Sequence, residues 1–581
     1  MQWSLGGVGV FYQTSYNFRD ILSKVVGSHG LKFGGEIAAE QNNDTNTGGA
    51  RPDYFFGNLW NFANDAPIRE SGNFEPKTGN FTNVKKYVRN KVYSLFAQDD
   101  WKLRPNLTLN LGLRWEYFAP LKEKFGNLGT LILGAGQNAL TGARFVTGEA
   151  LHEPDRNNFG PQTGFAWSPA RFRNKAVLRG GFGIGYNRIP QSITLNGRSN
   201  PPFVGSFTLT EPSQILYTLG PSLTSFYGFP GNPNTTLQFD PATNIPLPRP
   251  GAARPNVFGA GQDVPNPYTY RYSLEAQYDL PGHWLASLGY QGSAGHKFPR
   301  VVNLGLFVKP NANLGTSQRV MLTDVNTSFN ALLARLTRRF SKGFDLNVQY
   351  RFSKSLDTCS NDDNCVQSFP FDQRTERGPS DYDATHAFTA SGLWDLPILS
   401  NRQDFIGKAF GGWQLNGIVT ASSGFPWTPV YDAGCVTLTD RGLVCPLRPV
   451  AYLGGLEQDT SNAGFQRGSF GPNFAQRFVP PPGGTADVPP PPGIGRNVFR
   501  GPHYFSVDMS VVKRVSMPKF IRLGEQAGID LRANVFNVFN NLNLAPFEFN
   551  STSTRINSVE FGRAQRALQG RVVEFQARFN F

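Results

Sequence analysis

The chain has 581 residues, a formal net charge of +14 at pH 7, and only 17% charged side chains against 13% aromatic ones and 63 glycines. Abundant glycine, many aromatic side chains and few charges are typical of an all-β protein rather than a helical one. The sequence contains no uninterrupted run of about 18 apolar residues, which excludes a transmembrane helix but leaves membrane-spanning strands open, since these need only about ten alternating residues.

The N-terminal residues Met1–Gly7 have neither the basic region nor the apolar region of a secretory signal. Residues 4–13 already alternate like part of a strand. Either the protein is cytoplasmic or the chain begins inside something longer, and we favour the second interpretation.

Strand-like segments of about ten to fourteen residues recur along the whole chain. The clearest is Leu107–Glu116, where apolar side chains hold the odd positions and mostly polar ones the even positions, as the two faces of a strand require. A sixteenth strand would form over residues 4–13. The predicted strands are 15–26, 31–41, 88–101, 107–118, 159–168, 175–187, 268–279, 284–293, 328–340, 344–356, 383–395, 412–424, 503–515, 526–539 and 571–581.

The connections between these segments alternate in length. Turns mostly of about three to six residues, usual for hairpins, alternate with connections far longer than soluble domains normally have. The predicted long loops are 42–87, 119–158, 188–267, 294–327, 357–382, 425–502 and 540–570. Short turns at one end and long loops at the other predict a single domain over residues 1–581: a transmembrane, antiparallel, up-and-down β-barrel of the bacterial outer membrane with extracellular loops. A large soluble β-protein, such as a propeller, is the alternative, but its loops would not be sorted by length.

The last segment alternates up to the final residue. Val573, Phe575, Phe579 and Phe581 fall on one side of the chain, and polar residues mostly on the other. Chain ends usually fray unless something holds them. A closed barrel would hold this end, because every backbone group in hydrocarbon needs a partner and the last strand would pair with the first.

Several motifs resemble those of TonB-dependent outer-membrane receptors. SLFAQDDWKLRPNLTLNLGLRWEYFAP (residues 94–120) resembles a hairpin of these receptors, and DLRANVFNVFNNLN (530–543) resembles their penultimate strand. The terminal phenylalanine is similar to the signal that the outer-membrane assembly machinery reads. YDLPGHWLASLGYQGSAGHKF (278–298) and GLKFGGE (30–36) resemble the Oar-like branch. The resemblance extends from about residue 15 to the end.

The resemblance implies a 22-stranded barrel that encloses an N-terminal plug, with a short TonB-contacting box before the plug. Only 15 or 16 strands are visible in the sequence, and no plug or box, so we expect the barrel part of such a receptor. The implied function is uptake of a ligand bound by extracellular loops. The implied partners are outer-membrane lipid and lipopolysaccharide, the assembly machinery, and the TonB complex through the missing plug. The ligand is unknown: siderophore, oligosaccharide and peptide all fit.

Two other functions stay open at this point. One is a passive outer-membrane pore or an adhesin-like barrel. The other is a surface or secreted β-protein that binds carbohydrate. An enzyme is not expected, because the sequence has no catalytic motif and no histidine pair at metal-binding spacing, and we expect no cofactor and no metal.

The cysteines and the arginines are the candidate site residues. Cys359 with Cys365, and Cys435 with Cys445, are close pairs in long loops, so disulfides, free thiols or a metal site are the open alternatives, and we favour disulfides. Five arginines lie at polar strand positions and are candidates for a basic lumen wall that passes anionic or polar solutes or holds a plug: Arg114, Arg179, Arg271, Arg351 and Arg532. They form no basic cluster on one element, so nucleic acid is not an expected partner.

Overall fold

The structure is a computed structural model of the whole chain. It describes residues 2–4, 10–45, 53–64, 66–78, 85–148, 150–210, 236–247, 254–260, 264–360, 372–399, 402, 404–432, 436–438, 442–444, 446–454, 457–471, 473–487, 493–516 and 528–580.

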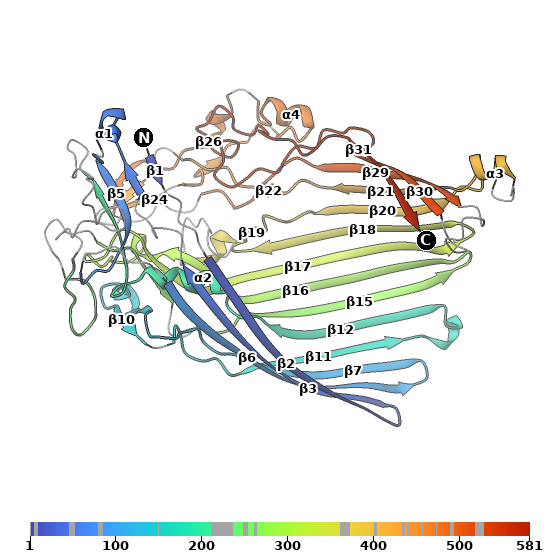
Figure 1. Cartoon of the computed structure of the whole chain (residues 1–581), viewed down its shortest axis with the longest axis horizontal. Coiled ribbons are helices and arrows are strands. Elements are labelled where there is room, and N and C mark those ends of the chain that lie inside the picture. Colours follow the sequence, from blue (N-terminus) through green and yellow to red (C-terminus); the bar gives the residue numbers. More distant parts are fainter. Residues whose placement is uncertain are drawn as a thin grey trace.

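One antiparallel sheet, which we call the wall, dominates the molecule (Figure 1). Each wall strand pairs with the next wall strand along the chain, from β2 through to β31. All fifteen predicted strands are confirmed. They are β2 (Val10–Val26), β3 (His29–Thr45), β6 (Lys85–Arg104), β7 (Leu107–Phe118), β11 (Asn158–Trp167), β12 (Ala176–Tyr186), β15 (Tyr268–Leu280), β16 (Trp284–Asn303), β17 (Gln318–Ser341), β18 (Phe344–Asp357), β20 (His386–Asp395), β21 (Trp413–Ser422), β29 (Tyr504–Ser516), β30 (Gly528–Phe536) and β31 (Val572–Asn580).

The two ends of the wall differ as the sequence predicts. The short turns and helix α3 (Phe405–Phe410) lie at the right of Figure 1, and the long connections gather at the left. One predicted loop, 294–327, is wrong in its bounds, because β16 continues to Asn303 and β17 begins at Gln318. The physical cause of this wrong prediction is a pair of register shifts around Phe298. They interrupt the alternation of apolar and polar residues that marks a strand in the sequence.

The wall has one polar and one apolar face. Cross-strand partners in an antiparallel sheet point to the same side, so the register assigns every side chain to a face. Leu111, Phe165 and Leu274 lie on the apolar face, where many large side chains are exposed. The polar face carries mainly amides, hydroxyls and charges. Exposed apolar side chains over a whole sheet face are what contact with lipid hydrocarbon requires.

The expected pairing of the last strand with the first is not made among the described residues. In this part of the chain β2 pairs only with β3, and β31 only with β30. Residues 11–26 are exposed on both faces, as is most of β31. Both edges of the wall therefore present backbone donors and acceptors that can pair with further strands.

Shorter elements fill the long connections. Five short strands extend the wall's sheet: β8 pairs with β6, β19 pairs with β18, β10 pairs with β9, and β14 pairs parallel to both β17 and β9. None of the described helices is long and apolar enough to cross a membrane. The strands are β1 (Gln2–Ser4), β4 (Asp53–Phe55), β5 (Arg69–Phe74), β8 (Lys122–Glu123), β9 (Gly129–Ile132), β10 (Arg144–Thr147), β13 (Gly205–Thr210), β14 (Val257–Ala260), β19 (Gly378–Pro379), β22 (Pro426–Trp427), β23 (Val436–Leu438), β24 (Gly442–Val444), β25 (Ala451–Tyr452), β26 (Phe478–Val479), β27 (Gly484–Ala486) and β28 (Phe499–Arg500). The α-helices are α1 (Leu59–Ala63), α2 (Gln191–Thr194) and α4 (Asn462–Arg467); the 3-10 helices are η1 (Gly136–Asn138), η2 (Ala170–Phe172), η3 (Leu195–Ser199), η6 (Leu304–Leu306), η7 (Gln373–Glu376) and η8 (Phe474–Arg477).

Candidate functional site: the polar wall and its loops

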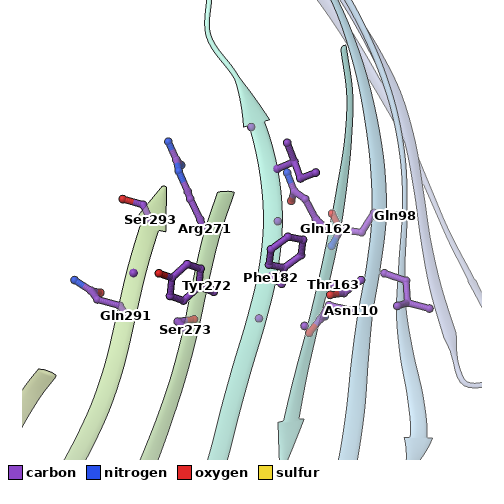
Figure 2. A pocket seen from close by; sticks show the side chains of 18 of the residues that line it. Gln98, Asn110, Gln162, Thr163, Phe182, Arg271, Tyr272, Ser273, Gln291 and Ser293 are labelled. Atoms are coloured by element: carbon purple, nitrogen blue, oxygen red, sulfur yellow. The ribbon is translucent and has the colours of Figure 1, made fainter. Parts of the chain in front are cut away.

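The polar face has a recess at the middle of the wall, across strands β6, β7, β11, β12, β15 and β16 (Figure 2). The recess holds about 620 Å³. Two neighbouring rows of cross-strand partners form it. One row is Gln98, Gly112, Gln162, Gly183, Arg271 and Ser293, and the other is Asn110, Gly164, Gly181, Ser273 and Gln291.

Glycines create the depth of this recess. A Cβ atom at Gly185 would meet nothing within 4 Å, and one at Gly112 would meet no atom closer than 3.6 Å. At these two positions the missing side chain leaves open space, whereas a Cβ at Gly181 would lie 3.2 Å from the Thr163 carbonyl oxygen and one at Gly183 would lie 3.3 Å from Gln162 Cγ. Gly180 in the same run differs, because its Cβ would lie 2.6 Å from the Phe165 ring on the apolar face. Of the three glycines of the run 180–185 on the polar face, Gly185 is the one that leaves open space.

Polar side chains surround the glycine floor. Figure 2 shows Gln98, Asn110 and Gln162 on one side and Arg271, Gln291 and Ser293 on the other. Asn110 is held in place by donating its amide to Asp100 Oδ1 at 2.7 Å. Carboxamides and hydroxyls both donate and accept hydrogen bonds, so the recess suits a ligand rich in hydroxyl or carboxylate groups.

Among the described residues that line the recess, Arg271 is the only cation. Within the described residues no carboxylate lies within ion-pair distance of its exposed guanidinium. A guanidinium without a partner offers a fork of N–H donors to a carboxylate or phosphate. Arg271 therefore gives the recess a preference for acceptor groups and negative charge.

The register brings the five predicted arginines to the polar face, though on separate strands. Arg114 is engaged within the wall, since its Nε lies 2.9 Å from Glu116 Oε1 and its Nη2 donates to Ser94 at 3.0 Å. Arg179, Arg351 and Arg532 have no ion-pair partner in the described part of the chain. Their role in a solute path or in holding a plug stays a prediction.

At the long-loop end, four residues of the 425–502 connection hold the loop that follows β18; we call this contact the loop clamp. Arg496 binds Asp357 and lies 3.3 Å from Asp381 Oδ1, and its Nε donates to the Glu376 carbonyl at 3.2 Å. Asp357 is almost completely buried. The remaining contacts join Arg448 to Glu376 at 2.9 Å, Arg500 to Asp383 at 2.6 Å, and Asn497 Nδ2 to the Pro379 carbonyl at 2.8 Å.

Burial shapes the Arg448–Glu376 contact of the clamp. The side chains are 5% and 1% exposed. Burial lowers the pKa of the Arg448 guanidinium from its ordinary value, while the Glu376 carboxylate opposes that shift. A buried pair of this kind specifies one arrangement of the two loops, because either charge alone would be costly to bury.

An aromatic core joins the same connection to the 540–570 loop. Trp427 is buried, and its ring lies 5.2 Å from Phe547, 5.5 Å from Phe561 and 5.6 Å from Phe499. The contacts with Phe547 and Phe561 are edge-to-face, and such contacts add to the stabilisation from apolar burial. Three loops, 357–382, 425–502 and 540–570, therefore pack as one extracellular assembly.

Neither the loop clamp nor the aromatic core was predicted from the sequence. The 425–502 connection is rich in arginine and phenylalanine, and this composition was the available signal. No cluster of three or more His, Cys, Asp or Glu side chains that could hold a metal occurs among the described residues.

Cys359 is disulfide-bonded. Cys365, Cys435 and Cys445 lie outside the described residues, so both pairings remain predictions. One observation favours Cys435 with Cys445: their sequence neighbours Val436 and Val444 are direct partners in the β23–β24 ladder.

We expect alkylation and mass spectrometry of exported, unreduced protein to find no free thiol. Peptide mapping should then recover Cys359 linked to Cys365 and Cys435 linked to Cys445. Reduction before alkylation is the control and should label all four cysteines. Four labelled thiols without reduction would contradict the disulfide prediction.

The C-terminal strand presents the predicted residues on the apolar face. Val573, Phe575 and Phe579 are 49%, 85% and 44% exposed, and Phe581 lies outside the described residues. Their part in assembly stays a prediction.

Comparison with known proteins shows which fold and which family this chain shares. The structure is similar to the outer membrane transporter YddB from Escherichia coli, with a TM-score of 0.50, 9% identity, and coverage of 97% of this chain and 53% of that one. It also matches the siderophore receptor PiuA from Acinetobacter baumannii (TM-score 0.44, 10% identity, 98% and 56% covered). The chain thus spans about half the length of these proteins. At such identities the likeness shows the fold alone.

No curated protein matches the sequence. The sequence profile of the outer membrane beta barrel domain, in contrast, matches residues 5–574, almost the whole chain. With its apolar outer face and polar inner face, the wall has the construction that such a domain requires. The chain belongs to the outer membrane beta barrel domain family and is an integral protein of the bacterial outer membrane.

Proposed function

We propose that this chain forms the barrel wall and outer loops of a TonB-dependent receptor of the Oar-like branch. In this proposal the packed loops capture a ligand, and the ligand passes along the polar wall. Energy comes from the TonB complex through a plug. The observation that carries the proposal is the recess, with its glycine floor and its unpaired Arg271, on the face that becomes the barrel lumen.

The proposal extends to the partners. The apolar face would contact lipid and the loops lipopolysaccharide. The exposed edge of β31, with Phe575 and Phe579 on its apolar face, would be the element that the outer-membrane assembly machinery recognises. The ligand class follows from the recess: a polar compound with hydroxyl or carboxylate groups. We assign no catalytic step.

The test does not require the ligand to be known. Cells that make the protein and cells from which it is deleted are grown in complex medium, and the compounds removed from the medium are measured by mass spectrometry. Each culture is run with and without a protonophore. We expect at least one compound whose removal needs both the protein and the proton gradient.

The alternatives give other results. Removal that needs the protein but survives the protonophore would indicate a passive pore. If the protein changes no compound in the medium but retains a carbohydrate at the cell surface, the binding protein or adhesin becomes the better description.

A further inference from the structure

The apolar face of the wall carries a groove near the short-turn end, away from the recess. It holds about 710 Å³. Its floor is made of alanines and its sides of large apolar and aromatic residues. The floor is Ala176, Ala276, Ala286 and Ala334; the sides are Trp167, Phe172, Tyr278, Leu288, Leu336 and Tyr350.

The register explains why the alanines form one groove. Ala276 pairs with Leu288, and Ala286 pairs with Tyr278, so small and large side chains alternate along each row. In the neighbouring row the same alternation of small and large side chains is shifted by one strand. The alanines therefore follow a zigzag across β12, β15, β16 and β17, and side chains such as Leu288, which is 55% exposed, stand above them.

Two cations lie at the turn end of this groove. The Arg171 guanidinium, which lines it, sits 4.6 Å from the centre of the Phe172 ring. Arg338 follows Leu336 in the same outward-facing file of β17 and lies 4.8 Å from the centre of the Phe344 ring. Stacking on a ring leaves the N–H groups at the edge of a guanidinium free to donate.

Neither cation has a carboxylate partner in the described part of the chain, and Arg338 Nε is buried without a hydrogen-bond partner. The nearby acid Asp279 is on the polar face, where it lies 3.8 Å from Arg339. The lipid side of this end of the wall is therefore positively charged, apolar just beyond the charges, and grooved.

We propose that this groove binds a glycerophospholipid with an anionic headgroup. The acyl chain lies on the alanine floor, and the phosphate accepts hydrogen bonds from Arg171 and Arg338. The short turns mark the periplasmic end of an outer-membrane barrel, so the groove opens into the inner leaflet at headgroup depth. At this depth an arginine side chain can bind a phosphate through two parallel N–H groups. A boundary lipid that only covers the apolar surface would not require such a contact.

Native mass spectrometry of the full chain in detergent tests the proposal, with phosphatidylglycerol and phosphatidylcholine of identical acyl chains as probes. We expect one retained phosphatidylglycerol, bound roughly tenfold more tightly than phosphatidylcholine, because the choline cation of phosphatidylcholine repels the two guanidinium groups that its phosphate attracts. The variant Arg171→Ala with Arg338→Ala should lose this preference. The variant Ala276→Leu with Ala334→Leu should retain neither lipid, because leucines fill the groove.

Ala533→Leu is the matched control, since Ala533 also faces outward but lies on β30, outside the groove. It should bind both lipids as the unmodified chain does. Each variant is first checked for a heat-sensitive shift in gel mobility, which reports a folded barrel. Equal binding of the two lipids to the unmodified chain, or full retention of phosphatidylglycerol by the leucine pair, would overturn the proposal. If the leucine pair does not fold, the arginine pair, with little apolar packing at stake, decides.

Discussion

Phenylalanine at Gly185 is expected to slow the movement of a polar anion through the protein several-fold. Gly185 lines the recess on the polar face, and a side chain there would enter open space, since nothing lies within 4 Å of its Cβ position. The ring would occupy the depth that the glycines leave. Swelling of proteoliposomes in isosmotic gluconate measures the effect.

Gly417→Phe is the matched control. Gly417 is also a strand glycine with room for a side chain, its nearest atom being the Asp508 carbonyl oxygen at 3.9 Å, but it lies on the apolar face of β21. Glycine weakens a strand by about 0.5–1 kcal/mol relative to alanine, so neither substitution should lower stability. The two variants therefore differ in the face that the ring occupies.

Equal swelling rates for Gly185→Phe and the unmodified chain would mean that the recess lies off the solute path. A slowed Gly417→Phe would point instead to a general effect on the sheet. A third variant, Arg271→Ala, separates charge from space: it should reduce gluconate swelling but leave swelling in a neutral sugar unchanged.

The wall could be predicted from the sequence because its cause is local. Each strand has to present an apolar side to lipid and a polar side to water, and this alternation is written residue by residue, as in Leu107–Glu116. Where the alternation breaks, the prediction failed. The register shifts around Phe298 hid the last ten residues of β16, although the backbone there continues to pair with β17.

The recess was only partly predictable. Arg271 was identified as a cation on the polar face, and Gly181, Gly183 and Gly185 alternate along β12 on that same face. Their meeting with Gln98 and Gln291 depends on the registers of five strand pairs, which no single segment encodes. Arg114 is the opposite case: its partner Glu116 is two residues away on the same strand face, so this ion pair could have been found from spacing.

The loop clamp could not be predicted, because its partners are far apart in the sequence. Arg496 and Asp357 are separated by 139 residues. The contact exists only when β18, β20 and the aromatic core have set two loops side by side. Loop charges such as these look like ordinary solvated residues in the sequence, and burial alone distinguishes them.

Arg496→Ala is expected to release the 425–502 connection from the rest of the loop assembly. Removing one partner of a buried ion pair leaves the other charge without compensation, which costs about 3–5 kcal/mol. Asp357, 6% exposed, would be left in that state. Hydrogen exchange of the amides in residues 425–502 measures the loss, since local opening free energy sets their protection.

Arg374→Ala is the control for this experiment. Arg374 also pairs with an acid in the same loop, Asp372, at 3.0 Å, but its side chain is 91% exposed. Solvent screens such a pair, so its removal should leave protection unchanged. If both variants exchange like the unmodified chain, the clamp does not hold the loops.

A conservative change shows whether charge or geometry holds the clamp. Arg496 donates from Nε, Nη1 and Nη2 to acceptors on three segments: the end of β18, the turn at Glu376, and Asp381. Lysine keeps the charge but has a single nitrogen, which cannot reach all three. Arg496→Lys should therefore keep the Asp357 contact and lose the other two, giving protection between those of the unmodified chain and Arg496→Ala. Full protection in the lysine variant would show that the charge of residue 496 alone fixes the outer loops.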